Sequence, residues 1–520
     1  MADVVVVGAG HNGLVAATLL ARSGLAVQVL ERAEVVGGAC RTEFPFAKAP
    51  GLAASTGAYL FGLMPPELLA LLDLDLPLVR RDPHYFLPTP DGRSLLLGAD
   101  PDVAWRQFAE FFSERDARAD RGLAAELAVL REDVAPAWLA EPLPVEETAE
   151  RYVRPPLRRT FVELVRGSAI DYLDRFGFVS ETVVAMYAVT DGMPGLTGSP
   201  WSRGSGHNLL VHAMCRLPGA GGTWMIVRGG MGTVTARLAE LAVKAGATIR
   251  TGVEVERVLL SGGAASGVRT VDGEEVPARA VLVSTDAFRL PGLLGDAAPA
   301  DLVERIAGYA ERSPGQTMKV NLALRGLPRF AAMTEDRGQY GATVHLLPPR
   351  AADGSVLTAL RRAFDDAAAG RLPDAPPLEW YLHSTLDPSL SDGGGNHSSA
   401  LFVQGVPHAP AGSTWAVEKA AYIDRLLDLV EAYAPGTREL LVDVHALTPP
   451  EIRDHFGITS ANIMHVDNSI SFADRMPYVT GVPGVYAGAA GCHPAGSVIG
   501  AAGHNAAARM VADLGLPAFA

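Results

Sequence analysis

The chain has 520 residues, of which 48% are hydrophobic, and its formal net charge is −14. This length and composition are sufficient for a large buried core and two domains. Nucleic acids require a basic protein surface, so an acidic chain with a pI near 5.4 is not expected to have a nucleic-acid partner.

The chain opens on a dinucleotide-binding pattern. Residues 4–7 are all valine, which is typical of a strand covered by helices on both faces. Gly8, Gly10 and Gly13 follow at the spacing of the nucleotide fingerprint. Gly8 would make the tight turn, Gly10 would let the backbone approach a pyrophosphate, and Gly13 would let the next helix pack close to its strand.

A helix is expected at about residues 12–23, with Gly24 as its left-handed C-terminal cap. Its N-terminus would face the phosphates, where unpaired N–H groups stabilise an anion and Asn12 is a further donor. A second strand at residues 26–30 ends at Glu31, whose carboxylate would accept hydrogen bonds from ribose hydroxyls. The alternative is a chance glycine turn in an ordinary βαβ unit.

Five residues separate Glu31 from the pair Gly37-Gly38. The E-x5-GG pattern resembles the signature of the flavoprotein superfamily that includes amine oxidases, carotenoid desaturases and the Rab GDP-dissociation inhibitors. The resemblance implies that the cofactor is FAD rather than NAD. It also implies that the segment Arg32 to Ala39 brings a second stretch of backbone against the FAD pyrophosphate.

The three cysteines, Cys40, Cys215 and Cys492, have no metal-ligand spacing and indicate a reducing compartment without a disulfide framework or a metal site. A secretory signal would need a basic and an apolar segment ahead of the first strand, so a cytoplasmic location is expected. No apolar run approaches eighteen residues. The apolar region 60–72 is either a buried helix broken at Pro65-Pro66 or a site of peripheral membrane contact.

Residues 75–215 have a mostly helical pattern, and an α/β pattern then returns. Glycines at 229–232 would open a helix that runs to about residue 245 and is closed by Gly246. Three strands follow, and Gly262-Gly263 marks a hairpin turn between two of them. The predicted strands are residues 248–250, 253–260 and 280–284.

Further along, residues 318–324 and 400–406 are predicted strands, and 417–433 is a predicted amphipathic helix. Residues 389–399 would form either a mobile surface loop or a lid. Near the C-terminus, residues 485–487 are a predicted strand, and a helix is expected to begin near 500–504. The small residues Gly488 and Ala489 would allow a close approach to a flavin, and the helix N-terminus would point at its pyrimidine.

The resemblance covers nearly the whole chain. GHNGLVAA, ERAEVVGGA, LPTPDGRSLLLG, RGGMGTVT, MKVNLAL, LFVQGVPHAP, FGITSANIMHVD and GVYAGAAGCHPAGSVIGAAGHNAA resemble phytoene-desaturase-related oxidoreductases. Among these, the chain is most similar to the branch named for a pyridine nucleotide-disulfide oxidoreductase domain, although it lacks the CxxC of true disulfide reductases. It departs from the family's THPGGGV stretch at Ala495 and Ser497, whose side chains would reshape the cavity beside the flavin.

This resemblance implies an α/β fold with a discontinuous Rossmann-type FAD-binding domain and an α+β substrate domain. The expected FAD-binding domain comprises residues 1–74, 216–294 and 455–520, and the substrate domain comprises 75–215 and 295–454. In the second FAD contact region of the family, backbone at the position of Val255 meets the adenine.

The expected chemistry is desaturation or dehydrogenation of an apolar or mixed small-molecule substrate, in which a C–H bond held over the flavin gives up a hydride. His493 is the candidate catalytic group, against the alternative of a packed structural histidine. Lys319 would either contact the flavin or form a buried ion pair. His465 and Asp467 would either border the site or close a strand, and His11 is expected to be an exposed turn residue.

Cys40 and Cys492 are expected to be small buried thiols. The alternative is that one of them forms a covalent bond to the flavin. Three other functions stay open: a flavin amine oxidase, a double-bond isomerase or saturase, and a non-catalytic binding protein on the same fold. The residues leave the substrate, the electron acceptor and the oligomeric state undetermined.

Overall fold

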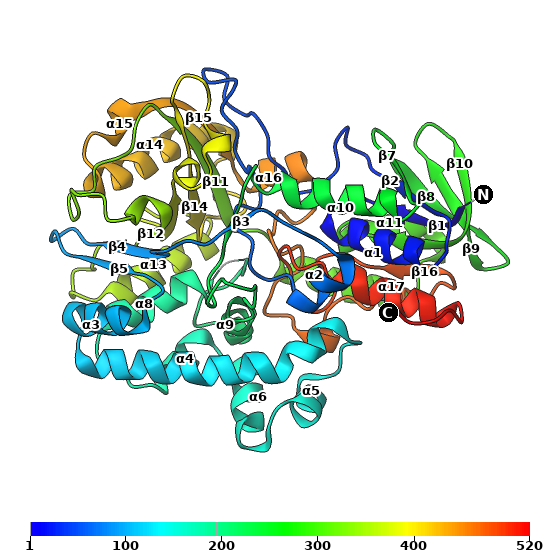
Figure 1. The fold of residues 1–520 in the computed structure, drawn as a ribbon, viewed down its shortest axis with the longest axis horizontal. Coiled ribbons are helices and arrows are strands. Elements are labelled where there is room, and N and C mark those ends of the chain that lie inside the picture. Colours follow the sequence, from blue (N-terminus) through cyan, green and yellow to red (C-terminus); the bar gives the residue numbers. More distant parts are fainter. Residues whose placement is uncertain (1, 194, 520) are drawn as a thin grey trace.

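The computed structural model describes residues 2–193 and 195–519. Figure 1 shows two sheets at opposite ends of the molecule and a set of helices beneath the second sheet. Each sheet has seven strands, and a two-stranded ribbon of β3 (Leu78–Val79) and β6 (Ile226–Val227) lies outside both. The α/β fold class is as predicted.

The first sheet surrounds the glycine-rich turn. Its strands follow the order β7-β2-β1-β10-β9-β8, with β16 also paired to β10. They are β1 (Ala2–Val7), β2 (Val27–Leu30), β7 (Thr248–Arg250), β8 (Val255–Ser261), β9 (Ala264–Thr270), β10 (Glu275–Val283) and β16 (Val485–Ala487). The four valines of β1 are at most 4% exposed, as expected for a central parallel strand.

Three helices cluster beside this sheet in Figure 1, and α1 (His11–Arg22) packs against both α10 (Gly232–Lys244) and α17 (Ala501–Asp513). Each lies within about two residues of its predicted bounds. Gly24 and Gly246 follow their helices with φ of +84° and +104°, so both predicted caps are confirmed.

The predicted hairpin at residues 262–263 is confirmed, because both glycines have positive φ and join β8 to β9. Strand β10 begins at Glu275, five residues before the predicted start. Its first residues pair antiparallel with β9, whereas its last three pair parallel with β16. Because the two halves of β10 pair with different strands, their side chains do not follow one hydrophobic pattern. The sequence pattern therefore predicted only the second half of the strand.

The second sheet has the order β15-β11-β14-β13-β12-β4-β5. Its strands are β4 (Tyr85–Pro88), β5 (Ser94–Leu97), β11 (Thr317–Leu324), β12 (Thr343–Leu346), β13 (Leu378–Tyr381), β14 (His397–Gln404) and β15 (Leu441–Leu447). Helix α14 (Trp415–Tyr433) packs on one face, where it shares a core with alternate residues of β11, among them Met318 and Val320. The predicted elements 318–324, 400–406 and 417–433 correspond to β11, β14 and α14.

Helices fill most of residues 101–213, as predicted. They are α3 (Pro101–Phe111), α4 (Glu114–Val134), α5 (Val145–Tyr152), α6 (Arg158–Arg166), α7 (Ala169–Asp174), α8 (Glu181–Thr190) and α9 (Ser205–Ala213). The hairpin β4–β5 was missed because its strands are only four residues long and lie beside this helical run.

The remaining helices are short or peripheral: α11 (Leu290–Leu294), α12 (Ala300–Arg312), α13 (Val356–Ala368), α15 (Thr437–Leu440) and α16 (Pro449–Phe456). The apolar region 60–72 contains α2 (Pro66–Leu72), so Pro66 begins the helix rather than breaking it. Leu68 and Leu72 on this helix are fully buried. Among the described residues, no helix combines the length and apolar character needed to cross a membrane.

Each sheet is built from the chain segments of one predicted domain. The exact domain boundaries stay a prediction. All strands of the first sheet lie within 1–74, 216–294 and 455–520, and all strands of the second lie within 75–215 and 295–454. The segment 389–399 does not line the main cavity. Asp387, two residues before this segment, accepts hydrogen bonds from the N–H groups of Gly229 and Gly230 at 2.8 and 3.2 Å.

Candidate active site

A cavity of about 860 Å³ extends between the two sheets. One end is lined by the glycine turn and the segments that follow β2 and β10, and the other by strands of the second sheet. This volume is near the upper end of the range for cofactor and ligand sites. The cavity therefore has room for a large cofactor together with a small substrate.

The three glycines of the first turn have three different physical roles. Gly8 has φ of +102°, a conformation that favours glycine. A Cβ on Gly13 would lie 2.1 Å from the carbonyl oxygen of Gly8, so this glycine permits close packing of helix on strand. Gly10 has φ of −71° and ψ of 172°, which any residue can adopt, and a Cβ there would meet nothing within 4 Å. The space at Gly10 is thus open to a ligand.

The first turn of α1 is suited to an anion. It has no acidic residue and no side-chain cap, so its free N–H groups point out of the helix end beside the cavity. Asn12 lines the cavity and accepts a hydrogen bond from the N–H of Gly503 at 3.3 Å. Asn12 therefore also ties the start of α1 to α17.

Glu31 lies at the end of β2 and lines the cavity. Its carboxylate accepts hydrogen bonds from the N–H groups of Ala9 at 2.7 Å and Ala33 at 2.9 Å. The acid thus holds the glycine turn in place and still offers free lone pairs to a ligand. Arg32 and Val255 line the same end of the cavity.

The second glycine pair lies directly against the first turn. The N–H of Gly37 donates to the carbonyl of Ala9 at 2.9 Å, and Gly37 forms an isolated bridge with Gly10. Gly37, Gly38 and Ala39 all line the cavity. One open space is therefore bordered by two stretches of backbone, the N-terminal end of a helix and a carboxylate. The backbone and helix N–H groups fit the pyrophosphate of FAD, and the carboxylate fits its ribose hydroxyls.

The C-terminal part of the site differs from the prediction. Gly488 and Ala489 are not among the residues that line the cavity; Ala490, Ser497 and Val498 line it instead. A Cβ on Gly488 would lie 2.8 Å from the Cβ of Ala506, so this glycine permits close packing against α17. Gly488 and Ala489 thus precede the lining residues instead of being among them, and their contact with the cofactor stays a prediction.

His493 is likewise absent from the cavity lining, contrary to the prediction that it lies near the ring. It is 1% exposed, and its Nε2 lies 2.9 Å from the carbonyl oxygen of Ala137 in the helical layer. Burial lowers its pKa to about 4, so the ring is neutral. This geometry corresponds to the packed structural histidine that was the alternative interpretation.

The other two histidines considered in the sequence, His11 and His465, both line the cavity. His11, expected to be exposed, begins α1, and its buried Nε2 has no hydrogen-bond partner among the described residues. Burial and the neighbouring His465 lower its pKa to about 4. His465 has φ of +63° and also lacks a partner at Nδ1 within the described chain. Asp467 instead accepts N–H groups of Thr197 and Ser469 at 2.6 and 2.7 Å, within a loop rather than at a strand end.

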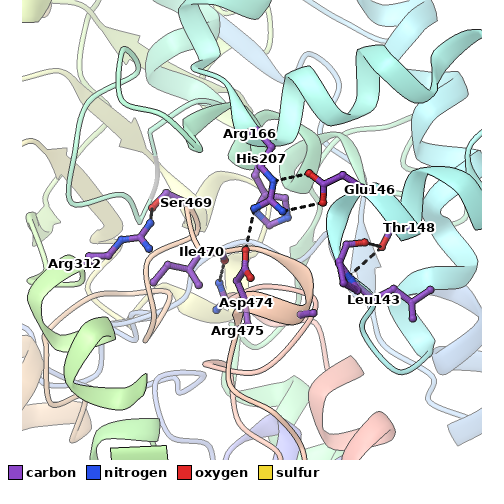
Figure 2. Close-up of polar contacts among 12 residues, drawn as sticks. Leu143, Glu146, Thr148, Arg166, His207, Arg312, Ser469, Ile470, Asp474 and Arg475 are labelled. Carbon is purple, nitrogen blue, oxygen red and sulfur yellow. Dashed lines mark hydrogen bonds and ion pairs between the residues drawn. The ribbon is translucent and has the colours of Figure 1, made fainter. Parts of the chain in front are cut away.

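Arg475 organises the loop that carries His465. Its guanidinium is buried and donates to backbone carbonyls on both sides of the loop, including those of Ile470, Ala490 and Cys492, each at 2.9 Å. Figure 2 shows this arginine beside Asp474, which pairs with Arg166 at 3.0 Å, while Arg166 also pairs with Glu146 at 3.1 Å. These contacts join the C-terminal loop to the helical layer.

The other end of the cavity was only partly anticipated. Thr317, Lys319, Thr343, His345, Glu379 and Tyr381 lie on one face of the second sheet, line the cavity and are at most 6% exposed; we call this group the polar sheet face. Of these only Lys319 was singled out in the sequence. A signal was present in MKVNLAL, where Lys319 and Asn321 alternate with apolar residues.

Lys319 has no carboxylate within 4 Å among the described residues, so the ion pair, one of the two alternatives for this residue, is not formed there. Its ammonium nitrogen lies 3.5 Å from the ring centroid of Tyr59. Of the two cysteines considered for a flavin bond, Cys40 lines the cavity and Cys492 does not. Burial raises the pKa of the Cys40 thiol to about 12, which makes it a poor nucleophile.

Residues 13–357 match the family model of flavin-containing amine oxidoreductases. The chain belongs to this family. It is 35% identical to the mouse pyridine nucleotide-disulfide oxidoreductase domain-containing protein 2, over 98% of this chain and 94% of that protein. It is 29% identical to hydroxyneurosporene desaturase of Cereibacter sphaeroides, over 98% of both chains.

The fold resembles that of an oxidoreductase from Methanosarcina mazei, with a TM-score of 0.64, 15% identity, and coverage of 98% of this chain and 99% of that one. The cofactor of the family is FAD, as predicted. The arrangement of Gly10, Glu31 and Gly37 around an open space fits that cofactor.

Proposed function

We propose that this protein is an FAD-dependent oxidoreductase of the desaturase or dehydrogenase type, which oxidises a C–C or C–N bond of a small molecule. The observation that carries this proposal is the single cavity that joins the FAD-binding glycine turn to the buried polar sheet face. When bound, FAD supplies the hydride acceptor. The second sheet then holds and orients the substrate.

The protein's own residues exclude water and handle protons. The cavity wall at the substrate end also includes the aromatic side chains of Tyr59, Trp224 and Phe402, which exclude water from the site. Oxidation of a C–C bond also releases a proton. The ring of His465 on the cavity wall can take it, because burial lowers the pKa of this histidine and keeps the ring neutral.

The purified protein tests the proposal directly. We expect a yellow protein whose flavin spectrum bleaches anaerobically with a substrate of the correct class. Carotenoids, amines and cyclic hydroaromatic compounds would distinguish desaturation from amine oxidation. A colourless protein that gains no flavin spectrum with added FAD would support a binding protein on the same fold.

Gly10→Val tests the cofactor site without disturbing the fold. The backbone at Gly10 accepts any residue and the space beyond is open, so the variant should fold normally and lose FAD. Gly308→Ala, an added Cβ in α12 that would also meet nothing within 4 Å, is the matched control and should keep FAD. Normal flavin content in Gly10→Val would show that the site is misplaced.

A further inference from the structure

The second sheet has one apolar and one polar face, and both are buried. Along β11, Met318, Val320 and Leu322 pack toward α14, whereas Lys319 points into the cavity. On the neighbouring strands the same alternation separates Trp380 from Glu379 and Val344 from His345. A buried polar face is costly unless its groups are satisfied, and it therefore indicates a ligand site.

The strand register brings the charged members of this face into one row. Lys319 is paired with Phe402, Phe402 with Glu379, and Glu379 with His345. Directly opposed residues in antiparallel strands project from the same face of a sheet. Lys319 and Glu379, which are 60 positions apart in the sequence, thus lie in one row with His345 across three strand pairs, and Phe402 separates Lys319 from Glu379 in that row.

Two basic side chains at this end lack a counter-ion. Arg81 is 5% exposed and lines the cavity, and its guanidinium donates to the carbonyl of Trp224 at 2.9 Å and to the hydroxyl of Thr343. Both partners are neutral. Lys319 is 4% exposed, and its ammonium nitrogen has no hydrogen-bond partner among the described residues. Neither side chain has a carboxylate within 4 Å in the described part of the chain.

The acids at this end are engaged elsewhere. Glu379 accepts hydrogen bonds from the Tyr381 hydroxyl and, at 3.4 Å, from the amide of Gln404. Asp191 lies 3.5 Å from Nδ1 of His212. The other titratable side chains that line this end are Tyr59, His84, Tyr85, Tyr187 and His345. The ammonium nitrogen of Lys319 therefore remains a buried donor that an added acceptor with negative charge would satisfy.

We propose that the polar sheet face is a subsite for a carboxylate group of the substrate, with Arg81 and Lys319 as its counter-charges. A carboxylate matches the planar fork of Arg81 and gives the unpartnered Lys319 an acceptor. This subsite rests on the proposed function and narrows the class of substrate that the enzyme would oxidise. The substrate is a small carboxylic acid, rather than a hydrocarbon polyene or a simple amine.

Burial lowers the pKa of Lys319 well below its usual range. The nearby carboxyl group of Glu379 raises this pKa and so partly opposes the effect of burial. A bound carboxylate would favour the protonated amine, which would then also lie 3.5 Å from the Tyr59 ring, within cation–π distance. Binding of the acid should therefore be accompanied by proton uptake.

The test is calorimetric titration of the purified protein, with and without added FAD, with three probes that carry the same cyclohexane ring: cyclohexanecarboxylate, its primary amide and cyclohexylamine. We expect the carboxylate to bind at least about tenfold more tightly than either of the others. Arg81→Met and Lys319→Met should each weaken carboxylate binding by about tenfold and leave FAD content unchanged. Methionine keeps the volume of each side chain, so both variants should fold. Lys244→Met removes an exposed charge from α10 and is the control.

Equal binding of the amide, preference for the amine, or no carboxylate binding at about 1 mM would overturn the carboxylate subsite. So would loss of FAD from both variants with unchanged carboxylate affinity, because the two cations would then serve the cofactor. The heat of binding does not depend on flavin colour. A colourless protein that still selects the carboxylate would therefore reject the redox function and keep the subsite.

Discussion

The two ends of the cavity recognise their ligands with different parts of the chain. At the cofactor end, the groups that face the open space are mostly backbone, as at Gly10, Gly37 and Gly38, and Glu31 fixes that backbone by accepting the N–H of Ala9. At the substrate end, they are side chains such as Lys319 and Glu379, held on rigid strands. At a site made of backbone, a glycine can be substituted only where the new Cβ would not meet the ligand or a neighbouring atom. At a site made of side chains, a single substitution can change which ligand binds.

Gly13→Val should have the largest effect, because it disrupts the packing beneath the backbone site. Its Cβ would lie 2.1 Å from the Gly8 carbonyl oxygen, so α1 would have to move away from β1. We expect a loss of more than about 4 kcal/mol in the free energy of unfolding, or no folded protein. Circular dichroism and thermal melting provide the measurement. Gly10→Val, with free space at the same turn, should melt within a few degrees of the wild type when both proteins are free of FAD.

That contrast also shows what could be read from the sequence. The glycines of the predicted cofactor end lie within forty residues, and their spacing follows from backbone sterics, so the sequence alone predicts that Gly8, Gly10, Gly37 and Gly38 lie together, and in the structure they line one cavity. The polar sheet face required the register of strands spread over residues 317–404, which depends on long-range pairing. The alternation around Lys319 predicted a two-faced strand but gave no information about what its polar face would meet.

The difference between the predicted and the observed cavity lining near the C-terminus has a related cause. Small residues around 488–502 are needed both for a ligand's approach and for close packing of α17, and composition does not distinguish these uses. Gly488 and Gly503 serve the packing, since a Cβ on Gly503 would lie 2.0 Å from the carbonyl oxygen of Asn12. Ser497, with φ of +106°, lines the cavity in a conformation that normally favours glycine.

Arg475→Met should have the next largest effect, because this side chain stabilises the loop that closes the cofactor end. It would leave the carbonyls of Val466, Ile470 and Ala490 without their donor. We expect a loss of about 3 to 5 kcal/mol in the free energy of unfolding, measured by urea denaturation. Arg166→Met, which removes a half-exposed pair with Asp474, should cost less than about 1 kcal/mol. Similar losses in the two variants would contradict a special role for Arg475.

Glu379→Gln should have the smallest effect and probes the substrate end alone. Burial is the main cause that raises the pKa of Glu379 from 4.5 to about 7, although the Tyr381 hydrogen bond and the nearby Arg81 and Lys319 lower it. The folded state therefore binds a proton that the unfolded state has lost. This group's contribution to stability is present in full below pH 4.5 and is lost as the pH rises to about 7.

Glutamine keeps an oxygen that can accept from Tyr381 but cannot titrate. The difference in unfolding free energy between wild type and Glu379→Gln should therefore fall between pH 4.5 and about 7 and stay level above that range. Urea denaturation at a series of pH values measures it, with the exposed Glu439→Gln as the control. A difference that is flat with pH, or that rises, would mean that Glu379 is ionised at the base of the polar sheet face. In that case Arg81 would already have its counter-charge, and the carboxylate subsite would lose its main electrostatic argument.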